Sequence, residues 1–488
     1  MKKVLLAVSM LATLVAMPAF AAVQNIKVGG DIDSTFIYRD RFDLGRDRSG
    51  TNGNDASEYK QNLFITQTRL RVDADLSDNV SATVALINER PWDNEGDVNT
   101  QSTSDTNIQL NLAYVKLREM LYSPLTVQVG RQQFNYGNAF IVGANGPNNL
   151  ANAGGLNKVA QDLTKRTALD GIKLVFDYHP LTIDVFGAKV DANGLTGTGP
   201  RKDEVDLYGI NANYQLGDQW NTTLETYFFS KFDRSLQTVA GAKTDTVFVP
   251  GLRASTNPIK GLNVQGEVAW QGGNKATTST SGAARADNLQ RQALGAEAIV
   301  NYQVQYEKVA KWKPAVTGVY TYVSGERNPS DGRDPFRPNS KNTWTGWDPM
   351  FEDQGGGTIY NTLFDLTNAH IVTTSAQISP IEDVTAKVTW TGLWLAREPD
   401  LGGVGNNQGT TVGNKYNFNM RQPDGTTITP AITSNRAIGW EIDGDLNYDY
   451  TEDVKLGLSL GWFVPGDFFG STNQQTAKQA LAHVGVTF

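Results

Sequence analysis

The sequence predicts an all-β fold, a transmembrane antiparallel β-barrel of about eighteen strands with short periplasmic turns and long extracellular loops. Three observations favour it: apolar and polar residues alternate, connections are short and long in turn, and aromatic residues lie at the ends of the alternating segments. A period of two is typical of a strand whose two faces meet different surroundings. A barrel wall between lipid and water has two such faces.

The alternation is clearest in residues 168–190. Ile172 and Leu174 share one parity of the first run, and Lys173 takes the other. The break at His179-Pro180 suits a turn, because proline lacks the N–H that a strand ladder needs. We interpret the stretch as a β-hairpin with one apolar face, and the rest of the chain repeats this unit.

About eighteen alternating segments follow one another, a number within the range of closed outer-membrane barrels. They lie near 26–41, 61–76, 80–92, 106–118, 125–136, 168–178, 181–190, 203–216, 220–230, 244–256, 261–271, 289–304, 312–324, 367–379, 383–397, 435–450, 454–464 and 477–488. Every second connection is short, and the longest of the others are 137–167, 325–366 and 398–433. Short turns at one end and long loops at the other are typical of a transmembrane barrel.

Aromatic residues on the apolar parity mark both expected membrane interfaces. If both termini are periplasmic, descending strands end at the inner interface and ascending strands at the outer one, where aromatic belts are expected. The descending ends carry Tyr178, Tyr214, Tyr302, Tyr448 and Phe488, and the ascending ends carry Tyr38, Trp270, Tyr322, Trp394 and Trp462.

Residues 1–21 have the pattern of a secretory signal peptide. Lys2 and Lys3 precede an apolar stretch, and Ala19-Phe20-Ala21 is a small-x-small end. The barrel is then expected over residues 22–488. The chain has no cysteine, which excludes disulfides and thiolate metal sites, and its net charge of −8 argues against a nucleic-acid partner.

The parity opposite the apolar face is expected to line the pore. The charged residues predicted there are Arg69, Arg71, Asp73, Asp75, Lys173, Arg253, Lys387, Glu441, Asp443 and Asp445. An acidic arc at the periplasmic mouth is expected, with Arg69 and Arg71 just above it, and its members are Asp31, Asp33, Asp73, Asp75, Asp443 and Asp445. Two interpretations stay open: solvated charges that pair with their neighbours, or charge selection in a water-filled pore.

The long loops are expected to narrow the pore. The connection 137–167 is rich in Asn, Gly and Ala, which are small enough to fold inward as a constriction. The connection 325–366 carries many aromatic residues, which predicts a packed lid or plug. These are Phe336, Trp344, Trp347, Phe351 and Tyr360.

Two other classes compete with a channel: a surface adhesin or receptor barrel, in which the loops matter and the pore does not, and an outer-membrane enzyme. The chain has three histidines, and neither G-x-S-x-G nor H-E-x-x-H occurs. No cofactor and no metal site are expected. Single-channel conductance distinguishes a channel from an adhesin.

Several stretches resemble the alginate-export family of outer-membrane channels. They are Val129–Gly137, Arg166–Phe176, Asn111–Arg118, Gly439–Tyr448 and Phe463–Phe469. The resemblance implies a monomeric eighteen-stranded channel, with a positively lined lumen in the alginate member. The sequence departs from the family at Leu169, where an aromatic is frequent, and in the mixed charge of its lumen.

We therefore expect a channel in the bacterial outer membrane that passes hydrophilic solutes or an anionic polysaccharide such as alginate. Its expected partners are outer-membrane lipid, small hydrophilic or anionic solutes and, where a polymer is exported, a periplasmic export partner.

Overall fold

The computed structural model describes most of the chain after residue 24. The described residues are 25–45, 59–92, 108–122, 124–143, 156, 159–191, 204–235, 243–278, 286–326, 343–353, 357–398, 420–423, 427–428 and 430–488. The predicted signal peptide and Phe336 lie outside them.

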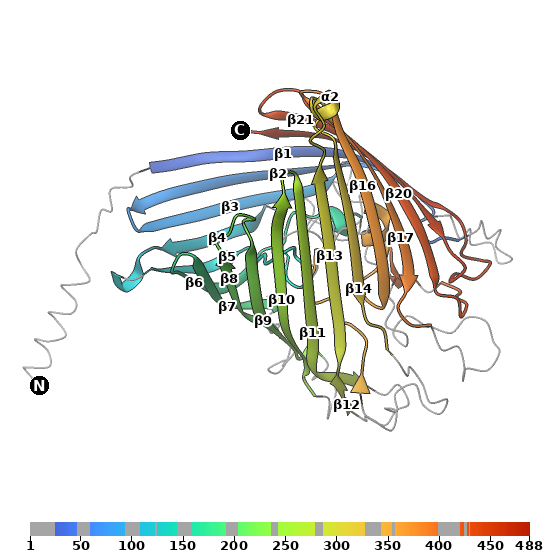
Figure 1. Cartoon of the computed structure of the whole chain (residues 1–488), viewed down its shortest axis with the longest axis horizontal. Coiled ribbons are helices and arrows are strands. Elements are labelled where there is room, and N and C mark those ends of the chain that lie inside the picture. Colours follow the sequence, from blue (N-terminus) through green and yellow to red (C-terminus); the bar gives the residue numbers. More distant parts are fainter. Residues whose placement is uncertain are drawn as a thin grey trace, which may run out of the picture.

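Eighteen wall positions form one antiparallel sheet, as predicted (Figure 1). The sheet has twenty elements, but β12 and β13 share one wall position on either side of Gln292, and the two-residue β15 lies outside the wall. The wall strands are β1 (Asn25–Asp40), β2 (Lys60–Ser77), β3 (Val80–Pro91), β4 (Gln109–Leu117), β5 (Leu125–Gln132), β6 (Leu169–Asp177), β7 (Leu181–Asp191), β8 (Val205–Gln215), β9 (Thr223–Asp233), β10 (Asp245–Ile259), β11 (Leu262–Thr278), β12 (Ala286–Arg291), β13 (Ala293–Gln303), β14 (Ala315–Val323), β16 (Ala369–Ile381), β17 (Val384–Leu395), β20 (Ala437–Asp449), β21 (Val454–Pro465) and β22 (Ala477–Thr487).

The remaining described elements are short and lie in the connections. They are η1 (Met120–Tyr122), η3 (Gln161–Leu163), α2 (Glu307–Ala310), β15 (Thr343–Trp344), α3 (Thr358–Leu363), β18 (Met420–Arg421) and β19 (Thr427–Ile428). No helix in the described part of the chain is long and apolar enough to cross a membrane.

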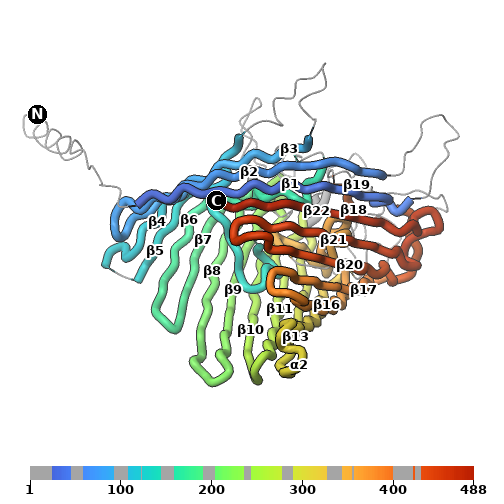
Figure 2. The backbone as a smooth tube through the Cα atoms, turned by 90° about the horizontal axis from the view of Figure 1, so that it is seen from above, coloured from blue at the N-terminus to red at the C-terminus, as the bar shows by residue number. Residues whose placement is uncertain are grey.

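The first and last strands close the barrel. β1 pairs with β22 from Asp31 opposite Thr487 to Asp40 opposite Lys478, and the two strands run side by side in Figure 2. Gly30 and Phe488 exchange both backbone hydrogen bonds, at 2.9 and 3.0 Å. A Cβ at Gly30 would lie 2.8 Å from Cζ of Phe488, so the absence of a side chain lets the terminal ring pack against β1. Closure leaves no unpaired edge in the hydrocarbon.

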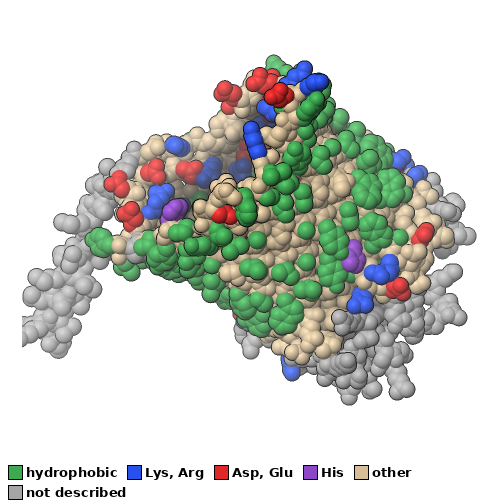
Figure 3. Space-filling view, in the orientation of Figure 1, with side chains coloured by type: hydrophobic (Ala, Val, Ile, Leu, Met, Phe, Trp, Pro, Cys, Tyr) green, Lys and Arg blue, Asp and Glu red, His purple; other side chains and the backbone are tan. Residues whose placement is uncertain are grey.

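The two faces of the wall differ as the alternation predicts. Apolar side chains such as Leu458 and Val268 are exposed on the outer face, whereas polar ones such as Glu441 and Gln67 are buried on the inner face. Nine of the ten aromatic residues predicted for the belts are among the exposed large hydrophobic side chains, and Tyr322 is half-buried. Figure 3 shows hydrophobic side chains spread over the wall and charged ones gathered toward its rims.

The connections at the two ends of the barrel differ in length, which confirms the predicted asymmetry. Residues 78–79, 260–261 and 382–383 are short turns, whereas 133–168 and 324–368 are long connections at the opposite end. The turn before β9 shows how a short connection is stabilised. Asp218 accepts hydrogen bonds from the backbone N–H and the hydroxyl of Thr222, both at 2.7 Å, and these bonds lower the pKa of Asp218.

Candidate functional site: the lumen

Arg69 and Arg71 project into the lumen from β2, and each pairs with a carboxylate. Arg69 lies 2.7 Å from Asp31 of β1, and Arg71 lies 2.7 Å from Asp73 on its own strand. The side chains of Arg69 and Arg71 are 34% and 44% exposed, so both guanidinium groups still face the lumen. Asp75, further along β2, makes no ion pair among the described residues. Pairing of both arginines favours the interpretation of neighbouring charges that neutralise one another, and their effect on passing ions stays a prediction.

The β5–β6 inner segment, described at residues 133–143, 156 and 159–168, folds against the inner wall. Leu156 and Ala160 pack on Ile37 and Ile65, which are fully buried on the inward parity of β1 and β2. Gln67 of β2 donates a hydrogen bond to the carbonyl of Leu163 at 2.8 Å. The predicted inward fold of the connection 137–167 beside the second strand is therefore confirmed for its described residues.

Lys165 of this inner segment adds a cation to the predicted acidic arc. Its Nζ lies 2.9 Å from Asp31 and also contacts Asp33. Both carboxylates were expected to give the mouth a negative charge. With Lys165 and Arg69 beside them, this part of the arc is neutralised.

Arg253 faces inward from β10, as predicted, but its donors hold other groups. It donates to Glu225 at 3.0 Å, to Gln265 at 2.7 Å and to Asn138 of the β5–β6 inner segment at 3.0 Å. The side chain is only 13% exposed. Arg253 therefore fastens the inner segment to the wall and presents little charge to a solute.

The β14–β16 inner segment, described at residues 343–353 and 357–368, packs beside the first one. Trp347 is buried and stacks on Phe140 with a centroid distance of 5.6 Å. The backbone N–H of Gly143 donates to the carbonyl of Phe351 at 2.7 Å, and the N–H of Phe351 donates to Ile141 at 3.0 Å. The predicted packing of the aromatic loop is confirmed, and the two inner segments are docked to each other.

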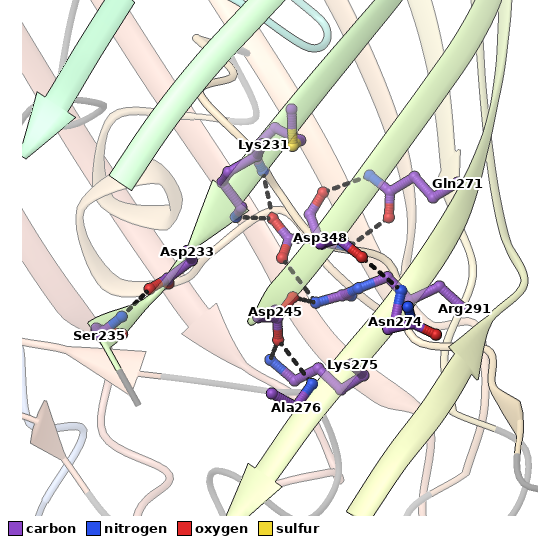
Figure 4. Close-up of polar contacts among 12 residues, drawn as sticks. Lys231, Asp233, Ser235, Asp245, Gln271, Asn274, Lys275, Ala276, Arg291 and Asp348 are labelled. Atoms are coloured by element: carbon purple, nitrogen blue, oxygen red, sulfur yellow. Dashed lines mark hydrogen bonds and ion pairs between the residues drawn. The ribbon is translucent and has the colours of Figure 1, made fainter. Parts of the chain in front are cut away.

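Asp348 fastens the β14–β16 inner segment to the outer ends of three wall strands (Figure 4). Its carboxylate lies 2.5 Å from Lys231 of β9 and 3.3 Å from Arg291 of β12. Arg291 also lies 2.5 Å from Asp245, which pairs with Lys275 of β11 at 3.0 Å. Burial raises the pKa of Asp348, but the charges of Lys231, Arg291 and Lys275 outweigh burial and hold it well below its usual range.

Glu441 and Asp443 face inward from β20 but lie beneath α3. Glu441 accepts hydrogen bonds from the backbone N–H groups of Ile359 and Tyr360, each at 2.7 Å, and Asp443 accepts one from the hydroxyl of Thr358 at 2.8 Å. Both carboxylates are almost completely buried. They hold the inner segment and do not stand free at the periplasmic mouth, because the helix covers them.

Lysines on the inward parity line the wall at two further places. Lys387 of β17 is in register with Asp445 of β20, whose carboxylate accepts a hydrogen bond from Ser459 at 2.7 Å. Lys116 of β4 and Lys173 of β6 are both in register with Gln128 of the strand between them. In the described part of the chain neither Lys116 nor Lys173 makes an ion pair, and the two lie within electrostatic reach of each other.

The sequence reasoning missed several charged residues of the lumen, among them Lys116, Lys165, Lys231 and Asp348. Lys116 follows a register shift in the pairing of β3 with β4, which changes the parity that simple alternation assigns. Lys231 lies on the inward parity of β9, and continuing the alternation of inward and outward residues to the end of this strand would have identified it. Lys165 and Asp348 lie in connections, where alternation carries no signal.

Other chemistries find no support in the described residues. No group of three His, Cys, Asp or Glu side chains there could hold a metal ion. His370 faces the apolar side of β16, where its Nδ1 lies 2.8 Å from the hydroxyl of Tyr320 and its ring lies against Tyr322. These contacts place it in the outer aromatic belt.

A closed barrel with an apolar exterior, a charged interior and inward-folded loops defines a porin-like channel of the outer membrane. The family model described as alginate export matches residues 25–483, and the chain belongs to this family. No curated protein sequence matches the chain. The family and the fold are those of transport channels, and the protein is a porin-like channel for solutes in the bacterial outer membrane.

Solved structures of Pseudomonas aeruginosa channels share the fold. OccK11 (OpdR) aligns with a TM-score of 0.51 and 10% identity over 96% of both chains. The outer membrane protein opdK aligns with a TM-score of 0.53 and 8% identity over 96% of this chain and 99% of that one. OccK2 (OpdF), solved in complex with glucuronate, aligns with a TM-score of 0.50 and 9% identity over the same shares.

Proposed function

We propose that the channel passes hydrophilic solutes that carry carboxylates, namely uronate sugars and an anionic polysaccharide built from them, such as alginate. The observation that carries the proposal is the pair of lumen lysines, Lys116 and Lys173, which lie within electrostatic reach of each other and make no ion pair among the described residues. The name of the family and the glucuronate bound to OccK2 point to the same class of solute.

The physical argument concerns where uncompensated charge meets the solute. A wall charge acts on a passing ion within a Debye length, about 8 Å at physiological salt. Arg69 and Arg71 are paired, and Lys165 neutralises Asp31 and Asp33. Lys116 of β4 and Lys173 of β6, which make no ion pair among the described residues, therefore supply positive charge to this side of the lumen, and they attract carboxylates.

The test is a reversal-potential measurement in planar bilayers under a salt gradient. The wild-type channel is expected to favour anions, and glucuronate is expected to reduce the chloride current. Replacing Lys116 and Lys173 together with Gln should lower the anion-to-cation permeability ratio, because two wall charges within a Debye length of a passing ion are removed. Lys455→Gln is the matched control, because Lys455 is 68% exposed near a short turn and lies 3.6 Å from Asp449. A ratio below one in the wild-type channel would contradict the proposal.

The charged residues singled out from the sequence take different parts in this proposal. Lys173 attracts the solute, and Lys387 of β17 adds a positive charge in register with Asp445 of β20. Arg69 and Arg71 contribute a weaker attraction for anions, because each is paired with an aspartate. Arg253 holds the β5–β6 inner segment in place.

We also infer that residues 1–21 are a cleaved signal peptide, that the barrel works as a monomer surrounded by outer-membrane lipid, and that it has no catalytic activity. Export of a polymer would require a periplasmic export partner at the short-turn end. Size-exclusion chromatography with light scattering in detergent tests the monomer.

A further inference from the structure

We propose that Lys231, Lys275 and Arg291 form a carboxylate-binding site at the outer end of the lumen, which Asp348 occupies when the β14–β16 inner segment is docked. The carboxylate of a uronate-type solute takes the place of Asp348 when the segment moves away. The chemical class of the solute rests on the proposed function, whereas the site rests on the contacts of Asp348.

The three cations converge from three different strands on one point of the inner wall (Figure 4). Lys231 lies 2.5 Å and Arg291 3.3 Å from the carboxylate of Asp348. Lys275 reaches the same cluster through Asp245, at 3.0 Å. The geometry around Asp348 is that of a carboxylate held by a guanidinium and an ammonium group.

The charge of the wall cluster is unbalanced without Asp348. Among the residues joined by these ion pairs, three cations and one wall carboxylate, Asp245, leave two net positive charges, and Asp348 cancels one of them. Arg291 is 1% exposed and Lys231 15% exposed, so both cations are poorly solvated. Removing one partner from a buried ion pair is strongly unfavourable. An anion from solution relieves that penalty when Asp348 leaves.

The proposed movement separates Asp348, which belongs to a connection, from Lys231, Lys275 and Arg291, which belong to wall strands. Two hydrogen bonds join the backbone of Asp348 to the side chain of Gln271 of β11, at 2.7 and 2.8 Å. The remaining contacts of the carboxylate are the ion pairs and the backbone N–H of Met350, at 3.0 Å. Lys231 and Lys275 are held by the pairing of β9 and β11 with β10, and β12, which carries Arg291, pairs with β11 as well as with β15 of the segment, so the site persists when the segment is displaced.

Competition for one site couples solute binding to the position of the inner segment. A solute that binds only the displaced state shifts the population toward that state by its affinity for it. Coupling free energies between linked sites usually correspond to factors of about 5 to 150 in affinity. An anionic solute thus releases the segment that obstructs its own path.

Three variants distinguish the carboxylate-binding site of the wall from the ion pairs by which Asp348 docks the segment. Asp348→Asn removes the tethered carboxylate and leaves the three cations. Lys231→Gln breaks the same ion pair but removes a cation from the site. Asp170→Asn is the control, because Asp170 of β6 is 67% exposed and pairs with Arg131 at 3.1 Å, away from the Asp348 cluster.

The experiment titrates sodium glucuronate into the compartment facing the long loops while single-channel conductance is recorded. Conductance in potassium chloride alone is expected to rise in Asp348→Asn and Lys231→Gln, because both release the segment. The concentration of glucuronate for half-maximal effect is expected to fall at least about fivefold in Asp348→Asn and to rise at least about fivefold in Lys231→Gln. Asp170→Asn should match the wild-type channel in both measurements.

Equal half-maximal concentrations in the wild type, Asp348→Asn and Lys231→Gln would overturn the inference. If glucuronate affects the wild type but Asp348→Asn changes nothing, the inference fails and the proposed function stands. A wild-type channel that prefers cations, combined with the opposite shifts in the two variants, would overturn the proposed function and keep the site. Heat-modifiable migration on gels confirms that each variant is folded, and Lys231→Gln tests the site should Asp348→Asn not fold.

Discussion

Leu458 and Ser459 of β21 test the assignment of the two faces of the wall. They are neighbours in the chain, and neighbours in a strand point to opposite faces. Leu458 is exposed on the outer face, and Ser459 donates a hydrogen bond to the inward Asp445 at 2.7 Å. Placing an arginine at each position in turn therefore compares its cost in stability on the lipid face with its cost on the lumen face at the same depth.

The depth of Leu458 follows from the strand geometry. A strand rises about 3.4 Å per residue and tilts about 40° in an outer-membrane barrel, which gives about 2.6 Å of height per residue. Leu458 lies four residues before Trp462 of the outer aromatic belt, hence about 10 Å below it. The apolar band is about 25 Å tall, so Leu458 lies within a few Å of the midplane.

Leu458→Arg is expected to lower the free energy of unfolding by about 2–4 kcal/mol, the penalty for arginine at the midplane of a barrel. Ser459→Arg loses one hydrogen bond, worth about 1 kcal/mol, and gains an ion pair with Asp445 worth about as much, so the change should stay within about 1 kcal/mol. Urea titrations in phospholipid vesicles, followed by tryptophan fluorescence, measure both values. Equal destabilisation by the two substitutions would refute the assignment of the faces.

Three further predictions concern selectivity, topology and pH. Replacing Arg69 and Arg71 with Ser should lower the anion-to-cation permeability ratio and leave folding intact, and an unchanged ratio in reversal-potential measurements would mean that the pair only neutralises its neighbours. An epitope tag at Gly405, outside the described residues, should be reached by antibody on intact cells, whereas surface labelling of a tag at Asp218 would contradict the topology. The ion pairs of Asp348 lower its pKa, so they stabilise docking above about pH 4, the ordinary value, and are lost as the pH falls further. Conductance should therefore rise below pH 4, and this rise should be absent in Asp348→Asn.

The wall was predictable from the sequence because lipid and water impose different demands on its two faces. The strand count, the alternation of connections and the aromatic belts all follow from that demand, and all are confirmed. The interruption at Gln292 and the register shift before Lys116 were not predictable. A bulge inserts one residue and leaves the composition of a strand unchanged, so no residue pattern marks its position.

The charge that a solute meets was less predictable, because parity places a side chain on the inner face but does not reveal its partner. Lys173 and Arg253 share the inward parity, yet in the described part of the chain only Arg253 is paired, with Glu225 and Asn138. Asn138 and Asp348 come from connections whose path depends on tertiary packing. A loop of this kind either neutralises a wall charge with a residue of its own or leaves that charge unpaired, so that it acts on the solute.

On the proposed function, the inner segments control selectivity more than the wall does. The wall supplies charges at fixed positions, and each docked segment decides which of them remain uncompensated. Lys165 neutralises Asp31 and Asp33 near β1, and Asp348 partly neutralises Lys231 and Arg291 near the outer ends of β9 and β12. Displacing the first segment would expose acids, whereas displacing the second would expose cations. An anionic solute stabilises only the second displacement, because a ligand shifts an equilibrium solely by its differential affinity for the two states. The same barrel would thus open toward anions through the β14–β16 inner segment while the β5–β6 inner segment stays docked.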